Sequence, residues 1–321
     1  MSFTRFEKTE TIVPRKVPGI GPSPYTPEWY EARKSTIGAS EAAAVCGLSR
    51  YAQPLEIYNR KKKISVPPPQ NAAMRRGTLF EPVVLQMYED RVGGGLWKTP
   101  PMFIHPKHKF MSATPDAMWC ETVVPSLTDN SWDDCIPVEA KTTERFNSDS
   151  FGEEGTDQIP QEYIFQVQQQ MAVTGKDRCD VPVCNGFDLK VYVVLRNEDI
   201  ISFLVESEKE MSERIANDDP PPVNWTHPKT YDIMKQVSGI NIEEAVELGP
   251  NVTSMWQQVE VLSKAKSNLE RQIKEHKAMV LNAMGTAGVG KMDDGRCLFR
   301  KKVKRKAKEM PASEFYRLTC K

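Results

Sequence analysis

Three carboxylates and one lysine have the residue types and the spacing for metal-assisted hydrolysis of a phosphodiester. Asp116 follows Pro115 in the segment ATPDA, Glu139 and Lys141 lie two positions apart in VEAK, and Glu81 precedes them. In a strand, side chains two positions apart point to the same face. Paired carboxylates suit hydrated Mg²⁺, which prefers hard oxygen ligands and keeps several waters. A lysine beside the metal can orient or deprotonate the attacking water, whose pKa the metal lowers.

The pattern by itself is not specific. An aspartate followed by Glu-x-Lys arises often by chance, and a surface ion pair between Glu139 and Lys141 would explain the spacing equally well. Asp116 and Glu139 lie 23 positions apart, so two neighbouring strands joined by a polar loop at 121–135 would bring the two carboxylates together. The elements around these residues therefore decide which interpretation holds.

The N-terminal part of the chain predicts an arm and two short helices. Residues 1–25 contain four prolines and few large apolar side chains, which indicates an extended arm. Thr26, followed by Pro27, is typical of a helix N-cap. A second helix is expected to open at Ser40 and to stop at Gly47.

A long amphipathic helix is expected to carry Glu81. Apolar residues recur at three- and four-residue spacing after the prolines at 67–69, and the helix ends at Gly93. Short strands follow it at MFIH, FMSATPDAMWC and PVEAKTT. A helix over about 158–174, strands at CDVPVCN and LKVYVVL, and a helix to about Ala216 come next. The expected fold class is α/β, with a mixed central sheet flanked by helices.

An Asp-Asp-Pro-Pro-Pro run predicts a domain boundary near residue 218, which gives a domain of residues 26–218 and an appendage of 219–321. Apolar residues from 255 to 280 alternate steps of three and four, a heptad pattern that Lys266 and His276 interrupt. This pattern predicts a helical hairpin or a short coiled coil.

The end of the chain is strongly basic. Nine lysines and arginines lie between positions 291 and 309. Asp294 and Gly295 between alternating residues predict a hairpin turn, so the basic residues would lie along a two-stranded β-ribbon. Such a ribbon could contact the phosphate backbone of duplex DNA, or it could be a solvated run of charge.

Composition excludes several classes of protein. The 43 Lys and Arg residues balance 43 Asp and Glu residues, so a generally basic nucleic-acid coat is excluded and any DNA contact must be local. No run of 18 apolar residues and no apolar leader occurs, which argues against membrane spanning and export. The seven cysteines are odd in number and form no CxxC pair, so we expect reduced thiols in a cytosol and no zinc or iron–sulfur site.

Five segments occur in an order and at a spacing that resemble a known family. They are TPEWYEARKSTIGASE, RRGTLFEPVVLQMYE, ATPDA, PVEAKTT and YIFQVQQQMAVTG. Over roughly residues 26–215, the chain is similar to the lambda-exonuclease-type, or YqaJ-like, viral recombinase nucleases of the PD-(D/E)XK superfamily. The resemblance implies a PD-(D/E)XK core, with Asp116 and Glu139-x-Lys141 as its signature.

The resemblance also implies roles for individual residues near the expected metal. Asp116 and Glu139 would be the metal-binding pair and Lys141 the catalytic lysine. Glu81 would be a further acidic ligand acting through water, and the carbonyl of Ala140 could complete the shell. Among the glutamines of FQVQQQ, the resemblance assigns an active-site role to Gln166, with Gln168 as a weaker candidate.

The same resemblance predicts a pocket for the 5′-terminal phosphate of the DNA. Arg33 and Ser40 match the positions that hold this phosphate in relatives, and Thr114 and Thr142 are further candidate DNA contacts. An arginine binds a phosphate through two hydrogen bonds, and a helix N-terminus at Ser40 favours anions. Such a pocket would place the chemistry one nucleotide from a 5′ end.

The resemblance therefore implies a Mg²⁺-dependent 5′→3′ exonuclease, in which Mn²⁺ can substitute for Mg²⁺. It would bind double-stranded DNA ends, release mononucleotides and leave a 3′ single strand for phage-type recombination. Relatives imply a ring-shaped homotrimer, a single-strand annealing protein as partner, and the cytoplasm of a bacterial host, with the gene carried by a phage or prophage.

Other interpretations stay open at this point. The protein could be a PD-(D/E)XK endonuclease or an end-processing nuclease, or a DNA-end-binding protein without catalysis. Glu81 could pair with Arg76 on a helix surface, Arg33 could be a surface cation and Ser40 only a helix cap. The four histidines have no ligand spacing, and Trp119 and Trp132 are expected to be packing residues.

Overall fold

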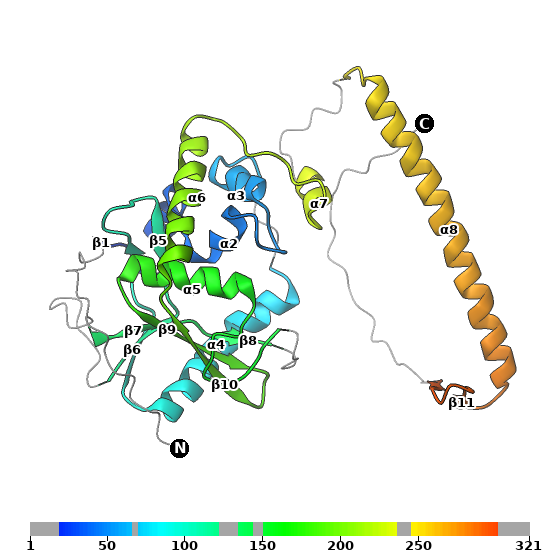
Figure 1. The fold of residues 1–321 in the computed structure, drawn as a ribbon, viewed down its shortest axis with the longest axis horizontal. Helices are drawn as coiled ribbons and strands as arrows, with labels where there is room; N and C mark the ends of the chain where they lie inside the picture. The colour runs from blue at the N-terminus through cyan, green and yellow to red at the C-terminus, as the bar shows by residue number, and fades with distance from the viewer. Residues whose placement is uncertain (1–18, 66–69, 122–133, 144–149, 236–244, 301–321) are drawn as a thin grey trace. The chain divides into compact units, whose positions relative to one another are not determined.

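The structure is a computed structural model that describes residues 19–65, 70–121, 134–143, 150–235 and 245–300 (Figure 1). The chain divides into two units, Met1–Ser238 and Gly239–Lys321. The division lies beyond the proline run near residue 218, because the segment after that run packs on the first unit. There the Gln53 side chain accepts from the Asn224 N–H (2.9 Å) and donates to Thr230 Oγ1 (2.9 Å).

Short helices follow strand β1 (Gly19–Ile20) in the first unit, as the sequence predicts, but the second α-helix begins at Ala42 and not at Ser40, which lies in a 3₁₀ turn. Helix α1 (Pro27–Ser35) is capped by Thr26, whose Oγ1 accepts from the Trp29 N–H at 3.2 Å. A 3₁₀ turn, η1 (Ala39–Glu41), and helix α2 (Ala42–Val45) follow, and the chain turns at Gly47 with φ +72°. Helix α3 (Pro54–Lys61) was not expected from the sequence.

Helix α4 (Ala72–Val92) is the predicted amphipathic helix. Asn71 caps its start through a bond from the Met74 N–H, and the chain leaves the helix at Gly93 with φ +68°, a conformation that favours glycine. Pro82 lies inside the helix, directly after Glu81. A proline there removes one backbone hydrogen bond and favours a bend next to the carboxylate.

A mixed six-stranded sheet forms the centre of the first unit. Its order is β10-β9-β7-β6-β3, with β8 also paired to β9, and the strands are β3 (Gly95–Lys98), β6 (Ala117–Cys120), β7 (Ile136–Val138), β8 (Lys141–Thr142), β9 (Arg178–Cys184) and β10 (Leu189–Leu195). Strands β7 and β8 run parallel to β9, and the other pairs are antiparallel.

A second, four-stranded sheet has the order β1-β4-β5-β2. Its strands are β1 (Gly19–Ile20), β2 (Ile37–Gly38), β4 (Phe103–Ile104) and β5 (Met111–Ala113). The segment FMSATPDAMWC, expected as one strand, is therefore two strands in different sheets. The break between β5 and β6 places Asp116 at the start of a central strand.

Helices α4 and α5 (Gln161–Thr174) cover opposite faces of the central sheet. Alternation along the strands separates the two faces: Cys179, Val181 and Val183 of β9 pack with α5, whereas Ala117 of β6 packs with Tyr88 of α4. Helix α6 (Glu198–Ala216) packs against α5, and the short α7 (Thr230–Lys235) follows (Figure 1). The functional residues thus lie where two helices and the strand ends meet.

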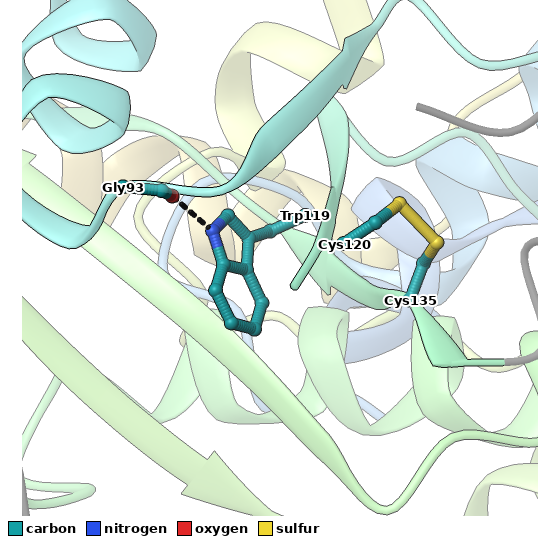
Figure 2. Close-up of a disulfide and its surroundings, with 4 residues drawn as sticks. All are labelled: Gly93, Trp119, Cys120 and Cys135. Atoms are coloured by element: carbon teal, nitrogen blue, oxygen red, sulfur yellow. Dashed lines mark hydrogen bonds between the residues drawn. A yellow bond between two sulfur atoms is a disulfide. The ribbon is translucent and has the colours of Figure 1, made fainter. Parts of the chain in front are cut away.

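The expectation of reduced thiols is wrong for one pair, because Cys120 and Cys135 form a disulfide (Figure 2). Strands β6 and β7 are antiparallel, with Trp119 opposite Ile136, so the next pair outward is Cys120 and Cys135. Their Cα atoms are 4.3 Å apart, as in a directly opposed antiparallel pair without mutual backbone bonds. The sequence spacing of 15 does not reveal this register.

The described residues of the second unit form one long helix and a hairpin. Helix α8 spans Pro250–Met284 without a break, so the helical hairpin expected from the sequence is wrong. Strands β11 (Val289–Lys291) and β12 (Cys297–Phe299) pair antiparallel around the predicted turn, and the ribbon is confirmed. The basic residues from 301 onward lie outside the described residues. Among the described residues, no helix is long and apolar enough to cross a membrane.

Candidate active site

The three residues of the predicted signature meet at the ends of the central strands. Lys141 Nζ donates to Glu139 Oε1 at 2.6 Å, and the Ala140 N–H donates to Asp116 Oδ2 at 2.8 Å. Asp116 precedes β6, Glu139 follows β7 and Lys141 opens β8, so pairing of β6 with β7 closes the gap of 23 residues. The predicted same-side placement of Glu139 and Lys141 is observed, although the chain breaks between two short strands there.

Glu81 of α4 interacts electrostatically with Glu139 and Lys141. Burial and the neighbouring Glu139 carboxylate raise the pKa of Glu81, while Lys141 opposes the shift. Burial, Glu139 and Glu81 together hold the pKa of Asp116 well above its usual range. Three carboxylates therefore repel one another in a partly desolvated space.

Lys141 carries the positive charge of the site. Burial lowers its pKa, but the carboxylates of Glu139 and Asp116 outweigh burial and raise the pKa above its usual value. Its ammonium also lies 4.8 Å from the centre of the Tyr163 ring. Lys141 therefore keeps its proton at neutral pH, which suits it to orient oxygen atoms and to stabilise negative charge rather than to act as a base.

Two glutamines of α5 hold Glu139 from the other side. Gln166 Nε2 donates to Glu139 Oε1 at 2.5 Å and its Oε1 accepts from Lys141 at 3.1 Å, while Gln170 Nε2 donates to Glu139 Oε2 at 2.6 Å. The structure thus brings Gln166 into the cluster. Gln170 was missed, although its spacing of four from Gln166 puts both on one helix face.

Gln168, the weaker sequence candidate, points away from the cluster. Its side chain accepts from the Asn197 N–H at 2.9 Å and donates to the Leu195 carbonyl at 2.7 Å. Gln169 likewise donates to backbone carbonyls, those of Ile37 and Ser112. Consecutive residues of one helix face different directions, so only two of the four glutamines contact Glu139.

A buried polar contact fixes α4 against the sheet. Tyr88 donates to Asp180 Oδ2 at 2.7 Å, and Arg178 holds the same carboxylate through two bonds of 2.6 and 2.8 Å. Tyr88 lies two helical turns after Glu81, on the same side of α4. The β9 residue Asp180 therefore positions the helix that carries Glu81, a role that the sequence did not indicate.

Arg33 and Ser40, the predicted phosphate pair, are in contact. Arg33 Nη2 donates to Ser40 Oγ at 3.3 Å, and the guanidinium stacks 4.7 Å from the centre of the Trp29 ring. Trp29 Nε1 in turn donates to Thr114 Oγ1 at 3.1 Å, two residues before Asp116. These contacts connect the predicted phosphate pair to the carboxylates, and Trp29, four residues before Arg33 on the same helix, was missed.

A buried ion pair fixes the segment that presents Arg33 and Ser40. Lys61 donates to Glu41 Oε2 at 2.6 Å and to the carbonyls of Arg33 and Thr36, both at 2.7 Å. Glu41 Oε2 also accepts from the Gly38 N–H at 3.0 Å. Burial opposes ionisation, but Lys61 and Arg33 outweigh it and lower the pKa of Glu41.

Tyr25 places an aromatic hydroxyl near the carboxylates. Burial, followed by the charges of Glu81 and Asp116, raises its pKa. Its ring lies 5.5 Å from that of Trp29, and its φ of +65° is uncommon for a residue with a side chain.

Four residues considered in the sequence analysis remain: Thr142, Trp119, Trp132 and His105. Thr142 lies in β8 opposite Cys184, next to Lys141. Trp119 has a packing role, since its indole N–H donates to the Gly93 carbonyl at 2.7 Å (Figure 2). Trp132 lies outside the described residues. The histidine His105 is structural, because its Nδ1 accepts from two backbone N–H groups.

The donor set fits a hard divalent cation such as Mg²⁺. Glu81, Asp116 and Glu139 offer carboxylate oxygens, and their mutual repulsion is the electrostatic condition that a bound cation relieves. Within the described part of the chain, no group of three His, Cys, Asp or Glu residues has the close geometry of a finished metal centre. The Glu139 carboxylate instead accepts hydrogen bonds from Lys141, Gln166 and Gln170.

An aspartate before one central strand, Glu-x-Lys at the end of the next, and helices on both faces define a PD-(D/E)XK core. The model of the YqaJ-like viral recombinase domain matches residues 28–177. The uncharacterized protein YqaJ of Bacillus subtilis (strain 168) is 24% identical over 269 residues, which are 82% of this chain and 79% of that protein. Residues 28–177 are therefore similar to the YqaJ-like viral recombinase domain, in agreement with the resemblance predicted from the sequence.

Solved structures also show similarity to the chain. An alkaline exonuclease from Laribacter hongkongensis has 22% identity and a TM-score of 0.48, over 60% of this chain and 94% of that one. A phage related exonuclease from Haemophilus somnus 129PT has 11% identity and a TM-score of 0.40, over 57% of this chain and 96% of that one.

Replacing Gln170 by Leu tests the role of this glutamine. If Glu139 binds a metal ion, we expect a 10- to 100-fold lower rate of DNA hydrolysis at a fixed metal concentration, because side chains that hydrogen-bond to a metal ligand and orient it have effects of about this size. Gln168→Leu is the matched control, since it removes a buried amide of the same helix that bonds only to backbone. Both variants lose stability, but only Gln170→Leu should need more metal for half-maximal rate. Equal metal dependence in both would contradict the assignment.

Proposed function

We propose that the protein is a Mg²⁺-dependent deoxyribonuclease that degrades the 5′-ended strand from the ends of double-stranded DNA. Mn²⁺ substitutes for Mg²⁺. The observation that carries the proposal is the meeting of Asp116, Glu139 and a protonated Lys141, with Glu81 beside them. The similarity of residues 28–177 to a viral recombinase domain supports a role in phage-type recombination, in which the products would be mononucleotides and a 3′ single strand.

Each residue of the site has a definite task in this reaction. Asp116 and Glu139 would hold the cation, and Glu81 would contribute through water. The bound ion supplies charge neutralisation at the phosphate and lowers the pKa of water. Lys141 donates to oxygen atoms at the reacting phosphate, and Gln166 keeps both Lys141 and Glu139 in place.

The proposed direction of degradation rests on the contact between Arg33 and Ser40, which Trp29 and Thr114 connect to the segment that carries Asp116. Arg33 and Ser40 would bind the 5′-terminal phosphate, with Trp29 supporting the guanidinium. Through its bond with Trp29, Thr114 connects these residues to the segment that carries Asp116 just before β6. A terminal phosphate held there would place the first phosphodiester at the carboxylates, which favours an exonuclease over an internal cutter.

The partners belong to the same proposal. The enzyme would act as a homotrimeric ring on duplex ends, would pass the 3′ strand to a single-strand annealing protein, and would work in the cytoplasm of a bacterium that carries the phage or prophage. The basic hairpin, with Lys291, Arg296 and Arg300 in the described residues, would contact duplex phosphates.

An end-labelled duplex tests the proposal directly. Linear DNA with either a 5′-phosphate or a 5′-hydroxyl and a covalently closed circle are incubated with Mg²⁺ or with EDTA. We expect mononucleotides from the 5′-ended strand, faster release from the phosphorylated end, no product from the circle and none in EDTA. Nicking of the circle would indicate an endonuclease, and end binding without any product would indicate a protein that only binds DNA ends.

Arg33→Gln tests the phosphate pocket separately from the chemistry. Loss of a charge-assisted contact costs about 1.5–3 kcal/mol, so we expect the preference for 5′-phosphate over 5′-hydroxyl ends to fall by roughly 10- to 100-fold. The rate on 5′-hydroxyl ends should change little. Arg214→Gln on α6, paired with Glu210 and Asp219, is the surface control. An unchanged preference in Arg33→Gln would remove the pocket from the proposal.

A further inference from the structure

Helix α8 exposes apolar side chains along its whole length. Within the described residues of the second unit, none of the 35 residues of the helix is buried, and Leu262 is 67% and Leu269 is 58% exposed. Most of the stability of a helix in a protein comes from packing of its apolar side rather than from helix propensity. A helix of this length with an uncovered apolar stripe therefore requires a partner.

The stripe on α8 is a heptad seam over five consecutive heptads. The heptad pattern extends one step toward the N-terminus, to Val252. The a positions are Val252, Val259, Lys266, Ile273 and Val280. The d positions are Met255, Leu262, Leu269, His276 and Ala283. Most apolar residues of α8 lie at a and d, while Trp256, Val261, Met279 and Leu281 lie outside these positions. A stripe concentrated at a and d is typical of the narrow seam of a coiled coil. A helix lying on a globular core has a wider apolar side.

The residue types in the seam select the kind of partner. Four of the five a positions carry valine or isoleucine, and the central d positions, Leu262 and Leu269, carry leucine. β-Branched residues at a with leucine at d favour a parallel, two-stranded coiled coil. A single lysine at one a position, here Lys266, fixes register and number of strands at some cost in stability.

The flanking positions allow two identical helices to pair. In a parallel pair, each g position faces the next e position of the partner. For two copies of α8 these pairs are Gln258 with Ser263, Ala265 with Glu270, Gln272 with Lys277, and Met279 with Met284. None of the four pairs joins like charges. Lys266 and Glu270 also lie 3.8 Å apart within one helix, which partly balances the lysine in the seam.

The seam continues into an apolar groove at the end of the helix. His276, Val280 and Met284 of α8 line it together with Leu298 and Phe299 of β12. Arg300 fixes the hairpin there, donating to the Gly285 carbonyl at 2.9 Å and to that of Leu281 at 3.2 Å. The a residue Val280 and the d residue His276 thus belong to both the seam and the groove.

We propose that α8 forms a parallel, in-register, two-stranded coiled coil with α8 of a second copy of this chain. The groove beside β12 extends the contact at its C-terminal end. The pairing concerns the second unit alone and does not depend on nuclease activity. If the first units form a homotrimeric ring, pairing of every α8 helix requires contacts between two rings.

Site-specific cross-linking of the full-length chain tests partner, direction and register together. Met255→Cys, Leu262→Cys and Leu269→Cys place one thiol at successive d positions, in a background with Cys297 and Cys320 replaced by Ser. Lys264→Cys, at the outward f position, is the matched control. After mild oxidation with diamide, we expect a covalent dimer from all three d variants and little from the control on a non-reducing gel.

Other cross-linking results would overturn the proposal in different ways. A dimer from only one of the three d variants would mean an antiparallel pair. No dimer above the Lys264→Cys level would mean that the seam packs on the same chain or on another protein.

Lys266→Ile gives a second measurement that does not depend on oxidation. An isoleucine in place of the seam lysine adds apolar surface to the contact, so the dissociation constant of self-association in sedimentation equilibrium should fall by about tenfold or more. Lys264→Ile, outside the seam, should leave it unchanged. Equal effects of the two substitutions would overturn the proposal.

Discussion

Asp116→Asn should abolish hydrolysis and yet yield a more stable protein. The carboxylate holds the cation in the proposed reaction, and its removal should lower the rate by about 10³-fold. In the folded protein, burial and the charges of Glu139 and Glu81 raise the pKa of Asp116 well above its usual range. The unfolded chain ionises this group more easily, so ionisation favours unfolding.

The pH dependence of this stability has a defined sign. A carboxyl whose pKa is higher in the folded state stabilises the fold most at a pH below the pKa it has in the unfolded chain. This stabilisation is lost as the pH rises from there toward the pKa of the folded state. Each unit of pKa difference corresponds to about 1.4 kcal/mol. Asp116→Asn should therefore unfold at a higher temperature than the wild type near neutral pH, with a smaller difference at pH 4.

Glu208→Gln provides the matched control for this prediction. Glu208 of α6 is fully buried, neither of its oxygens has a hydrogen-bond partner among the described residues, and burial followed by Glu41 raises its pKa well above the usual range. This variant should also gain stability near neutral pH while retaining full activity. Mg²⁺ should raise the unfolding temperature of the wild type and of Glu208→Gln but not of Asp116→Asn. A Mg²⁺ effect of wild-type size in Asp116→Asn would contradict its role as a ligand.

Lys141→Ala should lose hydrolysis by about 10²–10³-fold while duplex-end binding stays close to that of the wild type. The ammonium donates to Glu139 and to Gln166, and its raised pKa keeps it charged at the phosphate. In the proposed function, terminal-phosphate binding rests instead on Arg33 and Ser40, which are in contact.

Single-turnover hydrolysis and fluorescence anisotropy of a 5′-phosphorylated duplex in EDTA separate the two effects of Lys141→Ala. Lys62→Ala, a surface lysine paired with Asp218, is the control. Because the pKa of Lys141 is raised, wild-type activity should not fall through deprotonation of this lysine between pH 7 and pH 9. Full activity in Lys141→Ala would remove the proposed mechanism.

Sequence patterns did not predict the disulfide or the unbroken length of helix α8. Cys120 and Cys135 became partners only through the register of β6 with β7, and register is not visible in the spacing of two cysteines. The heptad pattern predicted helix over 255–280 but did not show whether a turn divides it into a hairpin. In the structure one helix runs from Pro250 to Met284 with no turn between them.

Local rules in the sequence determined much of the arrangement. The spacing of two put Glu139 and Lys141 on one side of the chain, Thr26 and Gly93 set helix ends, and Asp294-Gly295 set the hairpin turn. These features depend on strand alternation, capping and turn conformation, which act over a few residues.

Only the tertiary structure decided which distant residues share the site. Asp116 meets Ala140 and Glu139 because β6 pairs with β7, and Gln170 rather than Gln168 contacts Glu139 because of how α5 is rotated on the sheet. The Tyr88 contact with Asp180 likewise joins α4 to β9. Strand pairing and helix rotation follow from packing of the whole core, which no short stretch of sequence encodes.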